Sequence, residues 1–254
     1  MKQIPNLFTL LNLVFGCLAI VYTMQSGIEL ITDDSGLQSI RLPEKIWMGS
    51  VFIGLAAVID FVDGFVARLF KASSAMGQQL DSLADLVSFG VAPGLIIYQF
   101  LRLSLSGEPD GVDASMAYLL PAFIIPCAAA WRLARFNLDT TQQYGFKGLP
   151  TPSAGMLVAS FPLLYWFPVD QLVVQVLVNK WFWYGIILLV SWLMVSSLPL
   201  MALKFKDFSV KNNLPKFILI AATIVSALLL GWLAVPVVFI LYILLSLAFK
   251  NKTA

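Results

Sequence analysis

The sequence predicts an all-α integral membrane protein, a bundle of about eight transmembrane helices with the N- and C-termini cytoplasmic. The mean hydropathy of the chain is +0.87, which excludes an ordinary soluble globular protein. Hydrophobic residues make up 59% of the 254 residues, and charged residues only 12%. Apolar runs of about 20 residues, the length that crosses a bilayer as a helix, recur along the whole chain.

Eight apolar segments carry this hydrophobicity, and each is a predicted helix. They are residues 8–26, 46–67, 83–102, 116–136, 153–168, 181–201, 216–231 and 234–249. The fifth is short for a spanning helix, and the last two are joined tightly near Gly231. We expect a single domain over residues 1–254, with the motif core at 4–155 and additional C-terminal helices at 181–250.

The distribution of lysine and arginine predicts the orientation of these helices. With the N-terminus in the cytoplasm, twelve of the 16 basic residues fall on the cytoplasmic side. The other side holds Arg41, Lys45, Arg102 and Lys180. Cytoplasmic loops are enriched in lysine and arginine, so this bias favours both termini inside. The N-terminal apolar run has no small-residue cleavage site near its end, which indicates a retained first helix and not a signal peptide.

Four aspartates interrupt the apolar sequence at Asp60, Asp63, Asp81 and Asp85. Two sets of residues share a helix face by their spacing: Asp60, Asp63, Gly64 and Ala67 form one, and Gly77, Asp81 and Asp85 form the other. Unpaired carboxylates inside a membrane would cost on the order of several kcal/mol. Hard divalent cations are the natural counter-charge, so the spacing predicts a site for one or two Mg²⁺ or Mn²⁺ ions. The alternative is a set of helix-end carboxylates that face water.

The chain contains no histidine, which limits the chemistry available to it. A Ser-His-Asp triad, a phosphohistidine intermediate and a histidine base are all excluded. Any general base must therefore be a carboxylate, lysine, tyrosine or cysteine. The two cysteines, Cys17 and Cys127, lie within apolar segments, where we expect core packing and no disulfide.

The stretch from Asp60 to Asp85 resembles the signature of the CDP-alcohol phosphotransferase family, D-x2-D-G-x2-A-R-x8-G-x3-D-x3-D. Every fixed position is present: Asp60, Asp63, Gly64, Ala67, Arg68, Gly77, Asp81 and Asp85. The resemblance implies that the first three aspartates bind the metals, two per site. It also implies that Asp85 completes the metal site and acts as the general base. The expected CDP-lipid-binding residues are the first seven of the motif together with Asn6 and Thr9. The family also implies a homodimer.

Other stretches resemble the phosphatidylserine synthase branch of this family. They are IPNLFTLLN from Ile4, DSLADLVSFGVAPG from Asp81, RLARFN from Arg132 and GLPTPSAG from Gly148. The resemblance implies CDP-diacylglycerol as donor, L-serine as acceptor and CMP as product. It places the chain in the cytoplasmic (inner) membrane of a prokaryote, with its active site facing the cytoplasm. In the first stretch, Asn6, Thr9 and Asn12 lie on one side of the first helix, and the run resembles the family's entry helix, which borders the nucleotide. The alternative is capping by Asn6, with Thr9 and Asn12 as packing polar groups.

L-serine is a zwitterion, so its carboxylate requires a cation in the acceptor pocket. Arg132 and Arg135 are three residues apart and share a helix face, and arginine binds a carboxylate in bidentate fashion. We expect Arg132, Arg135 and Asn137 to bind serine, beside an irregular loop at Pro150 and Pro152. Positive-inside anchoring is the alternative for the two arginines.

Three other functions stay open from the residues alone. The same chemistry could use glycerol phosphate or inositol phosphate as acceptor. Because these acceptors carry a phosphate, their pocket would require a denser set of basic side chains. The donor could carry an archaetidyl lipid. A transporter or cation channel could also use intramembrane aspartates, but these four gather at one membrane face and do not line a path across it.

Overall fold

The computed structural model describes residues 4–25, 30–32, 38–40, 45–69, 74–106, 115–138, 146–168, 170–201 and 210–249. Helices make up almost all of this part of the chain, as the sequence predicts, and the chain is an all-α membrane protein. The strands are short. β1 (Leu30–Thr32) pairs antiparallel with β2 (Gln38–Ile40), and β3 (Phe146–Lys147) pairs antiparallel with β4 (Pro199–Leu200).

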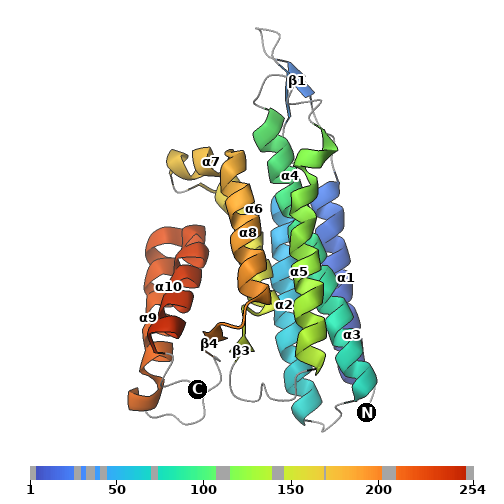
Figure 1. Ribbon diagram of the computed structural model, residues 1–254, viewed down its shortest axis with the longest axis vertical. Helices are drawn as coiled ribbons and strands as arrows, with labels where there is room; N and C mark the ends of the chain where they lie inside the picture. The colour runs from blue at the N-terminus through green and yellow to red at the C-terminus, as the bar shows by residue number, and fades with distance from the viewer. Residues whose placement is uncertain are drawn as a thin grey trace.

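The N-terminal helices form the half of the bundle that bears the aspartates. α1 (Ile4–Met24) packs along α2 (Ile46–Leu69) and also contacts α3 (Ala75–Leu86). A π-helical turn, η1 (Val87–Val91), joins α3 to α4 (Ala92–Ser106) without a break in the helix. The 3-10 turns η3 (Met116–Tyr118) and η4 (Leu120–Phe123) lead into α5 (Ile124–Leu138). In Figure 1, β1 lies at the opposite end of the molecule from the start of α1.

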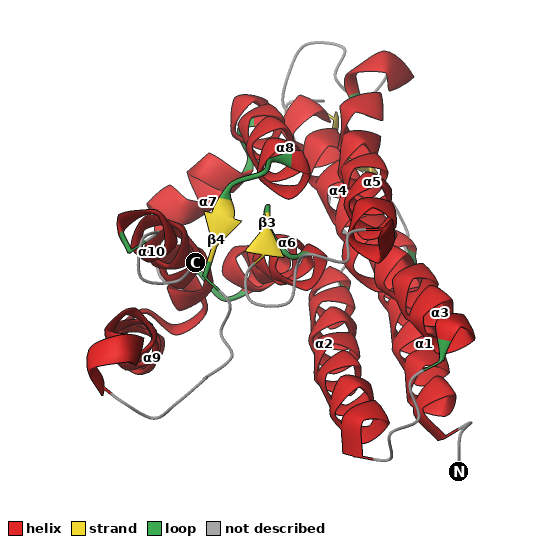
Figure 2. Ribbon diagram, turned by 60° about the horizontal axis from the view of Figure 1, so that its bottom comes forward, coloured by secondary structure: helices red, strands yellow, loops and turns green. Residues whose placement is uncertain are grey.

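The second half of the chain packs beside this group. α6 (Thr151–Trp166) contacts α2 and α4, and α7 (Gln171–Leu177) meets α8 (Lys180–Val195) at an angle of 73°. α9 (Val210–Leu230), the turn η5 (Gly231–Leu233) and α10 (Ala234–Ala248) complete the fold. Figures 1 and 2 both show α9 and α10 side by side, on the far side of α6 and α8 from α1 and α3.

Each of the eight predicted apolar segments overlaps a helix of the structure. By length and composition, five helical stretches of the described residues could cross a membrane, or six if the bent pair α7 and α8 is one span. α6 has only 16 residues, and α9 and α10 are counted within one stretch, Asn213–Ala248. The turn between them lies at Gly231, whose φ of 53° is a left-handed conformation that glycine adopts readily. The number of spans and their orientation remain predictions.

An aromatic core joins the two halves of the bundle. Phe100 of α4 stacks on Trp183 of α8, with ring centroids 4.6 Å apart, and Phe161 of α6 meets the same indole edge to face at 5.2 Å. The indole of Trp183 donates its N–H to the carbonyl of Leu177, which satisfies its one polar atom. These contacts fix α6 and α8 against the helix that continues from the aspartates.

Two expectations about individual residues are wrong. Cys17 and Cys127 are free thiols, as expected, but both are exposed on the helix surface and not packed in the core. An apolar residue on a membrane helix can face lipid as well as the core, so hydrophobicity alone does not place it inside. The irregular loop expected at Pro150 and Pro152 is also shorter, since α6 begins at Thr151 and Pro152 lies in its first turn, where a helix tolerates proline.

Candidate metal centre and acceptor site

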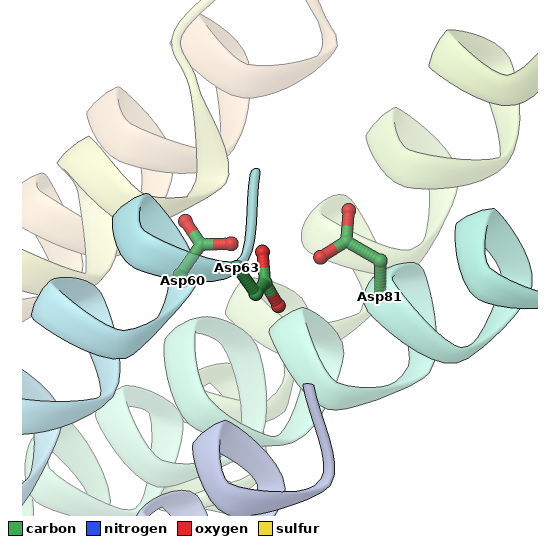
Figure 3. A group of neighbouring side chains, drawn as sticks. All are labelled: Asp60, Asp63 and Asp81. Atoms are coloured by element: carbon green, nitrogen blue, oxygen red, sulfur yellow. The ribbon is translucent and has the colours of Figure 1, made fainter. Parts of the chain in front are cut away.

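Three aspartates from two helices converge on one point. Asp60 and Asp63 project from α2, one helical turn apart, and Asp81 faces them from α3 (Figure 3). One carboxylate oxygen from each lies within 4.8 Å of the other two. Mg²⁺ holds oxygen ligands at about 2.0–2.1 Å, so two oxygens on one ion lie at most about 4.2 Å apart. A small approach of the three side chains would complete such a shell, so the cluster fits a divalent cation.

The cluster is held in place by the first helix. Asp63 is only 6% exposed, and the hydroxyl of Thr9 on α1 donates to its Oδ2 at 2.9 Å. The same hydroxyl lies 3.2 Å from the carbonyl of Pro5, one turn earlier. Thr9, predicted as a donor-lipid residue, therefore orients one of the candidate metal ligands.

Asp85 lies one turn beyond Asp81 on α3 but stands outside this three-oxygen group, within the described part of the chain. It is 7% exposed and accepts a hydrogen bond from the amide of Asn12, Nδ2 to Oδ1 at 3.2 Å. The equal helical spacing of the motif therefore does not give the four carboxylates equal surroundings. Three of them form a candidate ligand set, and the fourth is engaged by an amide of α1.

An open cavity of about 550 Å³ adjoins the cluster. Its lining includes Pro5, Asn6, Thr9, Asp63, Gly64, Ser74, Ala75, Gly77, Gln78 and Asp81. A Cβ at Gly64 would meet nothing within 4 Å, so the helix backbone there faces open space. A Cβ at Gly77 would lie 3.1 Å from both Asn6 Oδ1 and Ser74 Oγ, closer than an ordinary contact. The two motif glycines thus widen a cavity beside the candidate metal ligands.

The structure brings most of the predicted donor-site residues to this cavity. Asn6, Thr9, Gly64 and Gly77 line it together with two of the aspartates. Ala67 and Arg68 belong to α2, but their side chains lie outside the described part of the chain. Ser74 and Gln78 also line the cavity, although no pattern in the sequence singles them out.

The three predicted serine-binding residues have different surroundings. Arg132 is 7% exposed on α5 and donates from Nη1 to the hydroxyl of Thr151 at 3.0 Å. Its Nε is buried and has no partner among the described residues, and its charge is close enough to interact with Asp85. Arg135 instead donates to the carbonyl of Val195, at the end of α8.

Asn137 ties the end of α5 to α3. Its Nδ2 donates to Ser82 Oγ at 2.9 Å, and its Oδ1 accepts from Gln78 Nε2 at 3.3 Å. Both polar atoms of the amide are thus engaged by the helix that carries Asp81 and Asp85. Of the three residues, Arg132 alone combines deep burial with an unpaired donor in the described structure.

Asn12 was predicted only to share one side of the first helix with Asn6 and Thr9, with no contact to an aspartate. Its place on the same side of α1 as Thr9 was visible from the three-residue spacing. Its contact with Asp85 was not, because the two residues are 73 positions apart in the chain.

Comparison with known proteins defines the class to which this fold and site belong. The family model for CDP-alcohol phosphatidyltransferase matches residues 2–195, which is most of the chain and ends with α8. The chain therefore belongs to the CDP-alcohol phosphatidyltransferase family.

Individual relatives show which members of the family this chain resembles. A protein of Helicobacter pylori strain J99, named CDP-diacylglycerol–serine O-phosphatidyltransferase, is 32% identical over 222 residues, which are 85% of this chain and 77% of the relative. A protein of the same name from Saccharomyces cerevisiae is 40% identical over 126 residues, 46% of this chain and 41% of the relative. The archaetidylserine synthase of Methanothermobacter thermautotrophicus is 31% identical over 162 residues, 63% of this chain and 58% of the relative. The match thus covers less than two thirds of the length of the yeast and Methanothermobacter relatives.

Proposed function

We propose that this protein transfers the phosphatidyl group from CDP-diacylglycerol to the hydroxyl of L-serine, giving phosphatidylserine and CMP. The observation that carries the proposal is the three-aspartate cluster beside an open cavity, with a fourth carboxylate held apart from it. The relatives named for serine transfer support the choice of acceptor.

The donor would bind with its diphosphate at the cluster. Asp60, Asp63 and Asp81 would hold one or two Mg²⁺ or Mn²⁺ ions, and Asp85, which the resemblance also names as a ligand, lies outside this group. Such ions supply positive charge that offsets the charge of the diphosphate in the transition state. The cavity beside Gly64 and Gly77 would take the nucleotide, with Asn6, Ala67 and Arg68 as further donor contacts.

Asp85 would act on the acceptor. It takes the proton from the serine hydroxyl as the hydroxyl oxygen attacks the β-phosphorus, the one that bears diacylglycerol. A new P–O bond forms to serine, the bond to the CMP oxygen breaks, and CMP leaves with that electron pair. A carboxylate that is not shared with the ion cluster is the best placed of the four for this role, because a metal-bound oxygen has a lone pair already engaged.

Arg132 would bind the carboxylate of serine. Its guanidinium is buried, its Nε has no partner among the described residues, and its charge reaches Asp85, so a serine on Arg132 would lie near the base. A carboxylate would supply the missing hydrogen-bond partner. Arg135 and Asn137 would shape the pocket from the end of α5, where they already bind α8 and α3.

The setting we propose is the cytoplasmic membrane of a prokaryote, where eight spans place both termini and the active site at the cytoplasmic face. The ends of α1 and α10 that would face the cytoplasm lie toward the same end of the molecule in Figure 1, which agrees with an even number of crossings. The lysine and arginine bias supports the orientation. We further propose that the 254 residues form one domain and that the protein works as a homodimer.

The test is turnover of CDP-diacylglycerol by the purified protein with a panel of alcohols, with Mg²⁺, with Mn²⁺ and after EDTA. We expect serine-dependent CMP release that EDTA abolishes and either ion restores. Release driven by glycerol phosphate or inositol phosphate would refute the acceptor, and full activity in metal-free buffer would refute the metal-dependent mechanism. Because one relative is named archaetidylserine synthase, the assay also includes CDP-archaeol as a donor. Ion flux in proteoliposomes without CDP-lipid would favour a transporter.

A further inference from the structure

Two polar side chains of α1 each contact a different aspartate. Thr9 donates to Asp63 on α2 at 2.9 Å, and Asn12, three residues later, donates to Asp85 on α3 at 3.2 Å. The first contact is with a member of the candidate ion cluster, and the second is with the carboxylate outside it. The candidate ligand and the candidate base are therefore each held by a different side chain of α1.

The side-chain amide of Asn12 is buried, and only its nitrogen is hydrogen-bonded in the described part of the chain. Asn12 is 0% exposed, and its Oδ1 has no hydrogen-bond partner among the described residues. Burying an unpaired amide oxygen destabilises a protein, whereas an apolar side chain of similar size would carry no such penalty. The amide is thus poorly explained by packing, and its one described side-chain bond is the bond to Asp85.

The position of Asn12 relative to α3 is fixed from the other side by Ser88. The Ser88 hydroxyl donates to the backbone carbonyl of Asn12 at 3.1 Å. Ser88 lies in the π-helical turn η1, which begins two residues after Asp85. Such turns often occur at functional sites, since the extra residue in the turn changes the direction of neighbouring side chains.

Glycine at position 16 makes this approach possible. Gly16 lies one turn after Asn12 on α1, and a Cβ there would collide with Ser88. α1 and the π-helical turn are therefore in close contact immediately beside Asp85. The distance between the Asn12 amide and the Asp85 carboxylate is consequently set by rigid helix packing and not by a loop.

We propose that Asn12 is a positioning residue for the proton transfer. Its Nδ2 holds Oδ1 of Asp85, which keeps this carboxylate out of the ion cluster and presents Oδ2 to the hydroxyl of the acceptor. A carboxylate bound at one oxygen by a fixed amide cannot rotate freely toward a nearby cation, so the fourth aspartate of the motif stays a base. This inference rests on the proposed function, in that it takes Asp85 to be the group that accepts the proton.

The test compares three variants of buried polar residues on the same helix. Asn12→Leu removes the donor to Asp85, and Thr9→Val removes the donor to Asp63. Thr23→Val is the matched control, because Thr23 is also 0% exposed on α1 but lies near Gln99, toward the other end of the helix. For each variant, calorimetry measures CDP-diacylglycerol binding in Mn²⁺, and initial rates give kcat and the KM for serine.

We expect Asn12→Leu to lower kcat about 10- to 100-fold, which equals about 1.4–2.7 kcal/mol, with CDP-lipid affinity within about threefold of wild type. Thr9→Val should weaken Mn²⁺-dependent binding of the CDP-lipid, and Thr23→Val should change neither quantity. Retained CDP-lipid affinity also reports that the variant is folded. Loss of binding by Asn12→Leu to the same degree as by Thr9→Val would overturn the proposal.

A double-mutant cycle with Asp85→Asn distinguishes a role in proton transfer from a purely structural role of Asn12. If Asn12 acts through Asp85, then Asn12→Leu should slow an Asp85→Asn background less than about threefold. Equal slowing of the wild type and of the Asp85→Asn background would refute the role. Ser88→Ala is the second variant, should Asn12→Leu fail to insert; we expect a smaller loss of kcat that also disappears in the Asp85→Asn background.

Different results would refute the proposed acceptor and the proposed role of Asn12. If the wild type uses another alcohol, the proposed acceptor is wrong, and the same cycle is run with that alcohol, where non-additivity still supports Asn12. If the wild type uses serine and the effects of Asn12→Leu and Asp85→Asn multiply, the proposed function stands and the role of Asn12 is rejected.

Discussion

Replacing Asp85 by asparagine separates the base from the metal ligands. The substitution keeps the shape of the side chain and removes only its ability to accept a proton as a carboxylate. The new amide oxygen can still accept the hydrogen bond from Asn12 Nδ2, now 3.2 Å long, so the local packing should survive. The cluster of Asp60, Asp63 and Asp81 does not include residue 85, so binding of the ion should survive as well.

These contacts set the expected magnitudes. A positioned general base contributes about 10²–10⁴-fold to a rate, which corresponds to about 2.7–5.4 kcal/mol in the activation free energy. A neutral hydrogen bond that replaces a charged one changes the ground state by only about 1 kcal/mol. We therefore expect Asp85→Asn to lose about 10²–10⁴-fold in kcat while CDP-diacylglycerol affinity changes less than about tenfold.

The assay pairs calorimetric binding of CDP-diacylglycerol in Mn²⁺ with initial rates at saturating serine. Asp81→Asn is the matched control, since it makes the same chemical change one turn earlier on α3, at a residue of the cluster. It should weaken metal and nucleotide binding along with turnover. If Asp85→Asn loses metal-dependent binding as badly as Asp81→Asn, Asp85 is chiefly a ligand and not the base. Wild-type turnover by Asp85→Asn would also refute its role as the base.

Three further predictions follow from the same geometry. Arg132→Met should raise the KM for serine about 10- to 100-fold, because a charge-assisted hydrogen bond contributes about 1.5–3 kcal/mol, and should leave CDP-lipid affinity unchanged; an unchanged KM would remove Arg132 from the serine site. Gly64→Leu should fill open space beside the cluster and weaken CDP-lipid binding at least about tenfold, whereas Gly64→Ala should be milder; equal binding by both would place the nucleotide elsewhere. In a background without Cys17 and Cys127, Ser74→Cys should react with a membrane-impermeant thiol reagent from the cytoplasmic side and Lys45→Cys from the outside, and the reverse pattern would contradict the proposed orientation.

Much of the fold was accessible from hydrophobic periodicity, because a membrane helix satisfies its own backbone hydrogen bonds and its length is set by the bilayer. All eight predicted segments overlap helices. The bend between α7 and α8 and the π-helical turn were not predicted. Both depend on how neighbouring helices pack, and no local pattern of residues specifies them.

The spacing of the aspartates along the chain already indicated which carboxylates could act together. Spacing along two helices put Asp60 with Asp63 and Asp81 with Asp85, and no histidine was present to take their place. Their different surroundings were decided by tertiary structure. Asp60 and Asp63 of α2 and Asp81 of α3 bring three oxygens within 4.8 Å of one another, and an amide of α1, 73 residues away in sequence, engages the fourth carboxylate. Spacing within a helix fixes which residues share a face, but the distance between faces of different helices depends on side chains packed between them, such as Ser88 against Gly16.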